Sequence, residues 1–164
     1  MLTIEMLKET ELVQVHQLIS ITCNISWRDY YPQKSIDYVI DLLNVKTLSK
    51  KFLVAHFYCV KELGKIIGCG AIEANKNESV LSVIFVHPDY QRFGVGRKII
   101  QTLEKDSYGL QSNRIEVNAS FFAVPFYKKM GYEHKNGELV YNDGCFVMEK
   151  IKLDFDFKRS LLLS

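Results

Sequence analysis

The chain has 164 residues, of which 48% are hydrophobic and 24% are charged, a composition typical of one globular domain. Its 21 basic and 19 acidic residues give a net charge of +2, which is too small for a nucleic-acid-binding protein that works by charge alone. No apolar run approaches the roughly 20 residues that span a bilayer. The first twenty residues contain four charged side chains, so we expect no signal peptide and no membrane partner.

The four cysteines are far apart in the sequence. None of them forms a CxxC pair or a zinc-ligand spacing, so the pattern predicts no metal site. Free thiols in a reducing cytoplasm are the simplest interpretation, and we expect a cytoplasmic protein. The cysteines are Cys23, Cys59, Cys69 and Cys145.

The first part of the chain combines a weakly alternating segment with apolar residues at helical spacing. Thr10 can cap the first predicted helix and Ser35 the second. Pro32 separates them, because a proline biases the residue before it to an extended conformation. The pattern predicts a strand and then two helices, over residues 2–7, 10–27 and 34–44.

The middle of the chain is rich in β-branched and aromatic residues, with short turn segments between the runs. It predicts three consecutive antiparallel strands, over residues 51–62, 64–75 and 78–88. A helix, a strand, a short helix and two strands follow, over residues 94–109, 114–120, 123–131, 132–135 and 144–151.

The order βααβββαβαββ predicts a mixed α/β (α+β) fold, in which a mixed sheet of about six or seven strands carries helices on both faces. No linker or internal repeat divides the chain, so we expect a single domain over residues 1–164. The tail, residues 151–164, is compatible with a strand extension, a partner contact or disorder. Its apolar end hints at a homodimer contact.

Two glycines, Gly94 and Gly96, lie in a turn between a predicted strand and a helix. Glycines at such a turn often serve only a sharp bend or close packing. A helix N-terminus also presents unpaired N–H groups that bind anions. The usual nucleotide loops are absent, since neither GxxxxGK followed by Ser or Thr nor GxGxxG occurs there. The turn instead reads Gln-x-x-Gly-x-Gly.

Two segments carry a resemblance to a known family. The segment SVIFVHPDYQRFGVGRKIIQTLE, residues 82–104, resembles the acyl-CoA-binding motif of the GNAT N-acetyltransferase superfamily. The segment ASFFAVPFYKKMGYE, residues 119–133, resembles the second signature of the same family. The resemblance is sharp over about residues 65–150, which would form the acyl-CoA-binding core. Over residues 1–64 only the order of elements agrees. The resemblance to this family implies a mostly antiparallel sheet and acetyl-CoA as cosubstrate.

The resemblance also implies the coenzyme-binding residues. The main chain of Ile84 and Val86 would bond the pantetheine amides like an added strand. Ser120 stands where the family often has asparagine, and it would either bond a coenzyme amide or cap the short helix. The pyrophosphate would lie on the backbone N–H groups of one run of residues, which is Gln91, Arg92, Phe93, Gly94, Val95, Gly96 and Arg97.

Tyr127 falls on the family's tyrosine and would act as the general acid toward the thiolate of coenzyme A, although a core aromatic is the alternative. The family's glutamate base is not carried over, because Val80 stands at that position. A water-relayed Glu73 or bulk water would then accept the proton of the amine. The segment between the first two helices would shape the acceptor pocket, through Trp27, Tyr30 and Tyr31, although ordinary core and surface positions are the equal alternative for these rings.

These features predict an N-acetyltransferase that moves an acetyl group from acetyl-CoA to a primary amine by direct attack in a ternary complex. The acceptor would be a small-molecule amine or a protein amino group. The alternative is a non-catalytic, CoA-binding regulatory domain of the same fold. A nucleic-acid partner is disfavoured by the weak net charge.

Overall fold

The computed structural model describes residues 1–142 and 144–152. Within them, eight strands form one sheet in the order β1-β2-β3-β4-β5-β8-β6, and β7 pairs with β8 beside this path. All neighbours are antiparallel except β4 and β5, which are parallel. The strands are β1 (Thr3–Met6), β2 (Ala55–Glu62), β3 (Lys65–Asn75), β4 (Glu78–Val86), β5 (Arg114–Ser120), β6 (Glu133–His134), β7 (Tyr141–Asn142) and β8 (Cys145–Ile151).

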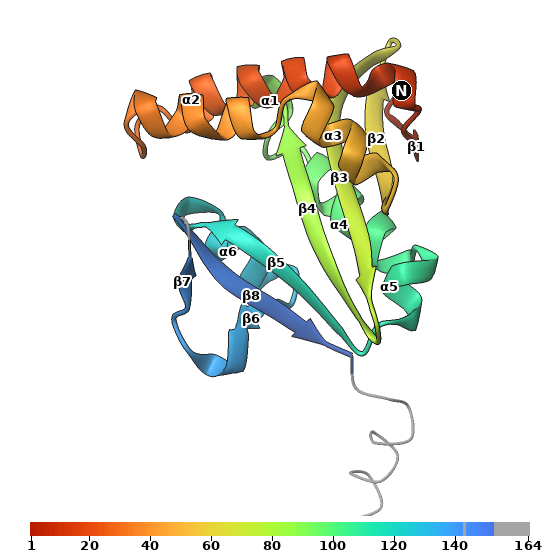
Figure 1. Cartoon of the computed structure of the whole chain (residues 1–164), viewed down its shortest axis with the longest axis vertical. Helices are drawn as coiled ribbons and strands as arrows, with labels where there is room; N and C mark the ends of the chain where they lie inside the picture. Colours follow the sequence, from red (N-terminus) through yellow and green to blue (C-terminus); the bar gives the residue numbers. More distant parts are fainter. Residues whose placement is uncertain (143, 153–164) are drawn as a thin grey trace, which may run out of the picture.

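Helices cover both faces of this sheet (Figure 1). On one face, three helices pack with β2, β3 and β4 around a first hydrophobic core. On the other face, the remaining helices pack with β3, β4, β5 and β8 around a second core. The first group is α1 (Leu12–Ser26), α2 (Gln33–Leu42) and α3 (Val45–Phe52), and the second is α4 (Val95–Lys105), α5 (Ser107–Gln111) and α6 (Val124–Lys129).

The predicted mixed α/β fold with a mostly antiparallel sheet is confirmed. The short strand β7 was not predicted. The tail that the sequence analysis left open lies, beyond Lys152, outside the described residues. Among the helices of the described residues, none has both the length and the apolar character that crossing a membrane requires.

The prediction was wrong around α3, where residues Lys51 and Phe52 end a helix rather than begin a strand. The side chain of Asn44 caps this helix by accepting a hydrogen bond from the amide of Thr47 at 3.0 Å. Leu48 is fully buried in the first core. The Asn44 cap and the burial of Leu48 stabilise the helix, and together they outweigh the high β-propensity of residues 51–54.

Three helix ends also differ from the prediction. Thr10 does not cap α1, because it lies in a short 3-10 turn whose Lys8 amide donates to the Glu11 carboxylate at 2.9 Å. Helix α2 begins directly after Pro32 and not at Ser35, since the fixed φ of proline suits a helix start. The predicted helix over residues 94–109 is divided at Asp106, which has an extended backbone and whose side chain caps α5.

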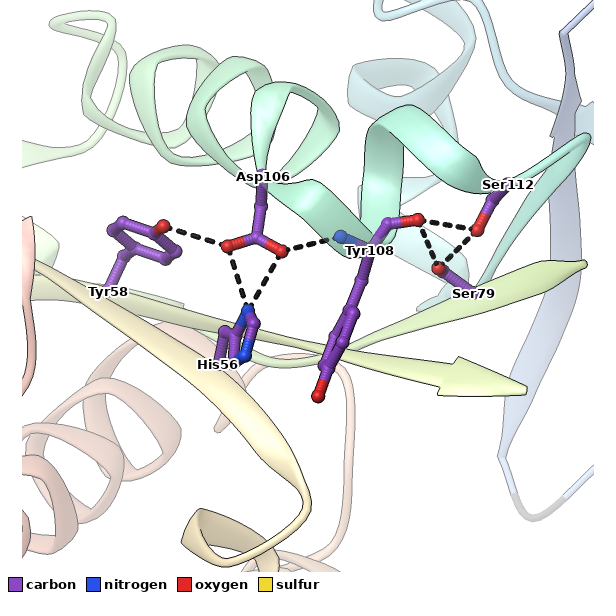
Figure 2. A network of polar contacts seen from close by, with 6 residues as sticks. All are labelled: His56, Tyr58, Ser79, Asp106, Tyr108 and Ser112. Carbon is purple, nitrogen blue, oxygen red and sulfur yellow. Dashed lines mark hydrogen bonds and ion pairs between the residues drawn. The ribbon is translucent and has the colours of Figure 1, made fainter. Parts of the chain in front are cut away.

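Asp106 is the centre of a buried polar network (Figure 2). The side chain of Asp106 is 4% exposed. It accepts hydrogen bonds from the amide of Tyr108 at 2.9 Å and the hydroxyl of Tyr58 at 2.8 Å. The Nδ1 atom of His56 lies 2.9 Å from Oδ1. Burial alone would raise the pKa of Asp106, but these partners outweigh it and hold that pKa below its ordinary value of 3.8.

The network extends from β2 to β4 through Tyr108. Its ring stacks on the imidazole of His56, with the centroids 3.9 Å apart. Its carbonyl accepts hydrogen bonds from the hydroxyls of Ser79 at 3.0 Å and Ser112 at 2.7 Å (Figure 2). The C-terminal end of α4 is therefore tied to two strands, which limits how far this helix can shift on the sheet.

We expect Asp106→Asn to lower the free energy of unfolding at pH 7 by about 1–3 kcal/mol, because an amide leaves buried donors without a full acceptor. The folded-state pKa of Asp106 is depressed, so its contribution is fully present above the unfolded pKa and is lost as the pH falls through the folded value. Urea unfolding from pH 7 to pH 3 measures this. Asp41→Asn, at an exposed position of α2, is the control. A stability difference that stays constant across this range would contradict the assignment.

Candidate active site

The strands β4 and β5 separate part-way along the sheet, and the region between their diverging backbones is called here the slot. The two strands pair only over Glu78–Leu81 and Arg114–Val117, and beyond these residues they diverge in a V (Figure 1). Ile84 and Val86 lie past the last pair, so this edge of β4 faces no strand among the described residues. A free strand edge presents main-chain groups that can bind an extended ligand.

A β-bulge in β4 accompanies the separation. The register with β3 shifts between Cys69 and Ala71, and Val83 has a φ of 53°, which is rare for a β-branched residue. The thiol of Cys69 donates to the carbonyl of Val83 at 3.3 Å. Because a bulge bends its strand and increases the local twist, it directs the end of β4 away from β5.

The glycine turn leads from β4 into α4. Gly94 has a φ of 83° and precedes the first residue of the helix. A Cβ atom built on Gly94 meets nothing within 4 Å, whereas one on Gly96 lies 3.2 Å from Cζ of Phe126. Gly94 is therefore required for its positive φ and not for lack of space. Gly96 permits the close packing of α6 against the start of α4.

The turn presents a run of unpaired amides. The six N–H groups from Arg92 to Arg97 donate to no acceptor among the described residues. The amide of Gln91 is different, because it donates to the carbonyl of Pro88 at 3.2 Å. Its side chain donates to Ser26 at 2.9 Å and to the carbonyl of Val86 at 3.1 Å. Gln91 thus fastens the turn to α1 and to β4, while the next six amides have no acceptor among the described residues.

Tyr127 lies on α6 and is 5% exposed. Burial raises the pKa of its hydroxyl well above the ordinary value of 10, and the nearby Cys145 thiol adds to the shift. The hydroxyl has no hydrogen-bond partner among the described residues. Ser120 ends β5 and its side chain makes no capping hydrogen bond. Both hydroxyls are therefore free to contact a ligand.

Glu73 faces Val80 across the β3–β4 ladder. Its carboxylate forms an ion pair with Lys51 of α3. On the other side of Val80, the ladder places Glu116 of β5, which pairs with Lys135 at 2.7 Å. Both of these carboxylates, which flank Val80, therefore have a lysine partner.

The segment between α1 and α2 brings Trp27, Tyr30 and Tyr31 together with two rings that the sequence analysis missed. Phe121 and Phe122 directly follow Ser120, and the ring of Phe122 stacks on Tyr30 with the centroids 4.7 Å apart. The only sequence signal was their position inside the second signature. With Phe85 of β4, these rings form a group, called here the aromatic cluster, that consists of Trp27, Tyr30, Tyr31, Phe85, Phe121 and Phe122.

The family model for the acetyltransferase (GNAT) domain matches residues 28–152, which is most of the chain. The chain belongs to the GNAT family. It is therefore an acyltransferase. Within the part of the chain that the structure describes, no group of three or more His, Cys, Asp or Glu side chains is arranged to hold a metal ion.

Solved GNAT structures share the fold. PaiA N-acetyltransferase from Thermoplasma acidophilum, solved in complex with coenzyme A, superposes with a TM-score of 0.80 at 17% identity, over 93% of this chain and 99% of that one. A GCN5-related N-acetyltransferase from Rhodopseudomonas palustris has a TM-score of 0.77 at 18% identity, over 92% and 95% of the two chains. A Mycobacterium tuberculosis protein in complex with CoA has a TM-score of 0.65 at 16% identity, over 92% and 99%.

One curated relative also matches. Glucosamine 6-phosphate N-acetyltransferase from Schizosaccharomyces pombe is 32% identical over 71 residues, which are 43% of this GNAT chain and 56% of that protein. The match thus spans little more than half of the relative.

We expect Cys69→Ala to destabilise this GNAT domain by about 1 kcal/mol more than Cys23→Ala does. Both variants remove a fully buried thiol, but only the first leaves the Val83 carbonyl without its donor, and a lost hydrogen bond costs about that much. Paired urea unfolding curves at pH 7 measure the difference. Equal losses for the two variants would mean that the thiol does not hold the bulge.

Proposed function

We propose that this acyltransferase is an N-acetyltransferase that moves the acetyl group of acetyl-CoA to a primary amine. The observation that carries the proposal is the placement of six unpaired amides, from Arg92 to Arg97, at the open end of the β4–β5 slot. Such amides, together with the positive end of a helix dipole, suit the pyrophosphate of the coenzyme. The slot suits its extended pantetheine arm.

The coenzyme would lie along β4. The main chain of Ile84 and Val86 would bond the pantetheine amides. The carbonyl of Val86 is already occupied by Thr22 at 3.3 Å and by Gln91, so this residue would bind through its N–H group. Ser120, at the end of β5 and without a capping bond, would contact a coenzyme amide from the other side of the slot.

The reaction would be a direct attack within a ternary complex. The amine nitrogen bonds to the thioester carbonyl carbon, the C–S bond breaks, and the thiolate receives a proton from the hydroxyl of Tyr127. The raised pKa of that tyrosine keeps the proton in place until the thiolate forms. The ammonium form of the acceptor loses one proton before the attack, and the same nitrogen loses a second as the amide forms, in each case to water, either directly or through Glu73. The tyrosinate of Tyr127 then recovers a proton from water. Deprotonating an amine of pKa about 10 at neutral pH costs only about 4 kcal/mol.

A small-molecule amine is the preferred acceptor, with a protein amino group as the alternative. The S. pombe relative is named for a small primary amine, glucosamine 6-phosphate.

Gly94→Glu tests the coenzyme site, because it adds a carboxylate beside the six amides. Acetyl-CoA at 100 times its dissociation constant should stabilise the wild type by about 2.7 kcal/mol and the variant far less. The matched control is Gly64→Glu, since Gly64 also has a positive φ, of 78°, and open space around it, but lies in the β2–β3 turn. Thermal unfolding with acetyl-CoA, coenzyme A or ATP reads out both. Stabilisation by ATP and not by acetyl-CoA would contradict the proposal.

Tyr127→Phe should lower kcat by about 100-fold or more while the acetyl-CoA affinity is kept, because only the proton donor is lost. Tyr132→Phe removes another buried tyrosine hydroxyl, bonded to Glu104 at 3.0 Å, and should leave kcat near the wild-type value. The raised pKa of Tyr127 also predicts a rate that rises as the acceptor amine deprotonates and does not fall near pH 10. Unchanged kcat in Tyr127→Phe would remove it from the mechanism.

A further inference from the structure

The aromatic cluster joins the two sides of the slot at its open end. Phe85 lies between Ile84 and Val86 on β4, and Phe121 directly follows Ser120 at the end of β5. Trp27 lies between β4 and the next residue, Phe122, with its ring 6.0 Å from the rings of both Phe85 and Phe122. The cluster therefore links the end of β4 to the segment that follows β5.

The cluster and Tyr127 belong to opposite faces of the sheet. Phe85, Trp27 and Tyr31 pack with the first core, under α1–α3, whereas Tyr127 is part of the second core, with α4 and α6. If the thioester lies in the slot with Tyr127 on one side, an amine reaches its carbonyl from the other side. That side is the one with the aromatic cluster.

Two members of the cluster are unusually open for large rings. Tyr30 is 51% exposed and Phe121 is 43% exposed. Their rings contact each other edge to face, with the centroids 5.4 Å apart. The hydroxyl of Tyr31 fixes the segment from below by donating to the carbonyl of Gly144 at 3.1 Å. The two exposed rings thus form an apolar surface on a segment that ring contacts and one hydrogen bond hold in place.

Two carboxylates near the base of the slot are already paired, while Arg28 and Asp29, beside Tyr30, are exposed and lie 3.9 Å from each other. Glu73 has Lys51 as its partner, and Glu116 has Lys135. A phosphorylated amine would need an unpaired cation, and a polyamine would need unpaired carboxylates. Neither is offered by these two pairs, which flank Val80 at the base of the slot.

One polar group remains at the vertex of the slot. Ser82 is the first residue of β4 after its last pair with β5. Its hydroxyl oxygen is buried and has no hydrogen-bond partner among the described residues. This buried hydroxyl offers one polar contact at the end of the slot opposite the aromatic cluster, which suits a ligand with one amine on an otherwise apolar body.

We propose that the acceptor is a primary amine carried by an aromatic or similarly flat apolar body, which stacks on Tyr30 and Phe121. This rests on the proposed acetyl transfer and narrows its acceptor. Aromatic rings bind a flat apolar body by offset or edge-to-face contact, and their faces also attract the ammonium form as it arrives.

Release of free coenzyme A from acetyl-CoA measures the preference, with 2-phenylethylamine, glucosamine 6-phosphate and 1,4-diaminobutane as acceptors. We expect kcat/KM for 2-phenylethylamine to exceed the other two at least tenfold. Tyr30→Ala should raise the KM for 2-phenylethylamine about tenfold and leave the KM for acetyl-CoA unchanged. Tyr30→Phe, which keeps the ring, should have the wild-type KM for 2-phenylethylamine.

Tyr38→Ala is the matched control, because Tyr38 is a 66% exposed tyrosine on α2 outside the cluster. A preference for glucosamine 6-phosphate or the diamine, no turnover of 2-phenylethylamine, or a Tyr30→Ala variant that behaves like Tyr38→Ala would overturn the inference. Acetyl-CoA would still stabilise the protein in each of these cases, which separates them from failure of the proposed function.

Discussion

The site depends on one constraint, which is that β4 and β5 stop pairing after four residue pairs. Val83 sits just beyond this point with a φ of 53°, a conformation that costs a β-branched residue free energy and persists only where the surroundings enforce it. The bulge, the Cys69 thiol on the Val83 carbonyl and the packed core on both faces supply that enforcement. If the ladder simply continued, the strand edge that faces the slot would be occupied by β5.

The same region of β3 positions the helix that carries the amides. A Cβ atom built on Gly70 lies 2.5 Å from Cγ2 of Ile99, and one on Gly68 lies 2.9 Å from Cγ1 of Val95. Only glycine therefore allows α4 to lie this close to the sheet. With its far end tied by Asp106 to β2, the helix is fixed at both ends. The distance between its N-terminal amides and the slot follows from these contacts.

The sequence predicts the parts of the site that depend on local spacing. The turn with Gly94 and the order of the strands are determined by the alternation of apolar residues along short segments and by the turn residues between them. Helix α3 was missed, because a long-range burial of Leu48 outweighs the propensity of its neighbours. Phe121 and Phe122 could not be assigned either, since their meaning comes from contact with a segment some ninety residues earlier. The lysine partner of Glu73 likewise comes from another element.

The two cores give the two sides of the slot different chemistry. Tyr127 is nine-tenths or more buried beside apolar side chains, and an acid in such a place stays neutral and keeps its proton. The opposite side has exposed rings and paired charges, which favour binding of an apolar body over strong electrostatic capture. An acid that must retain a proton and an amine that must lose one are thus kept on separate faces of the sheet. The strained separation of β4 from β5 is what lets them meet, because it opens the sheet only at the point between them.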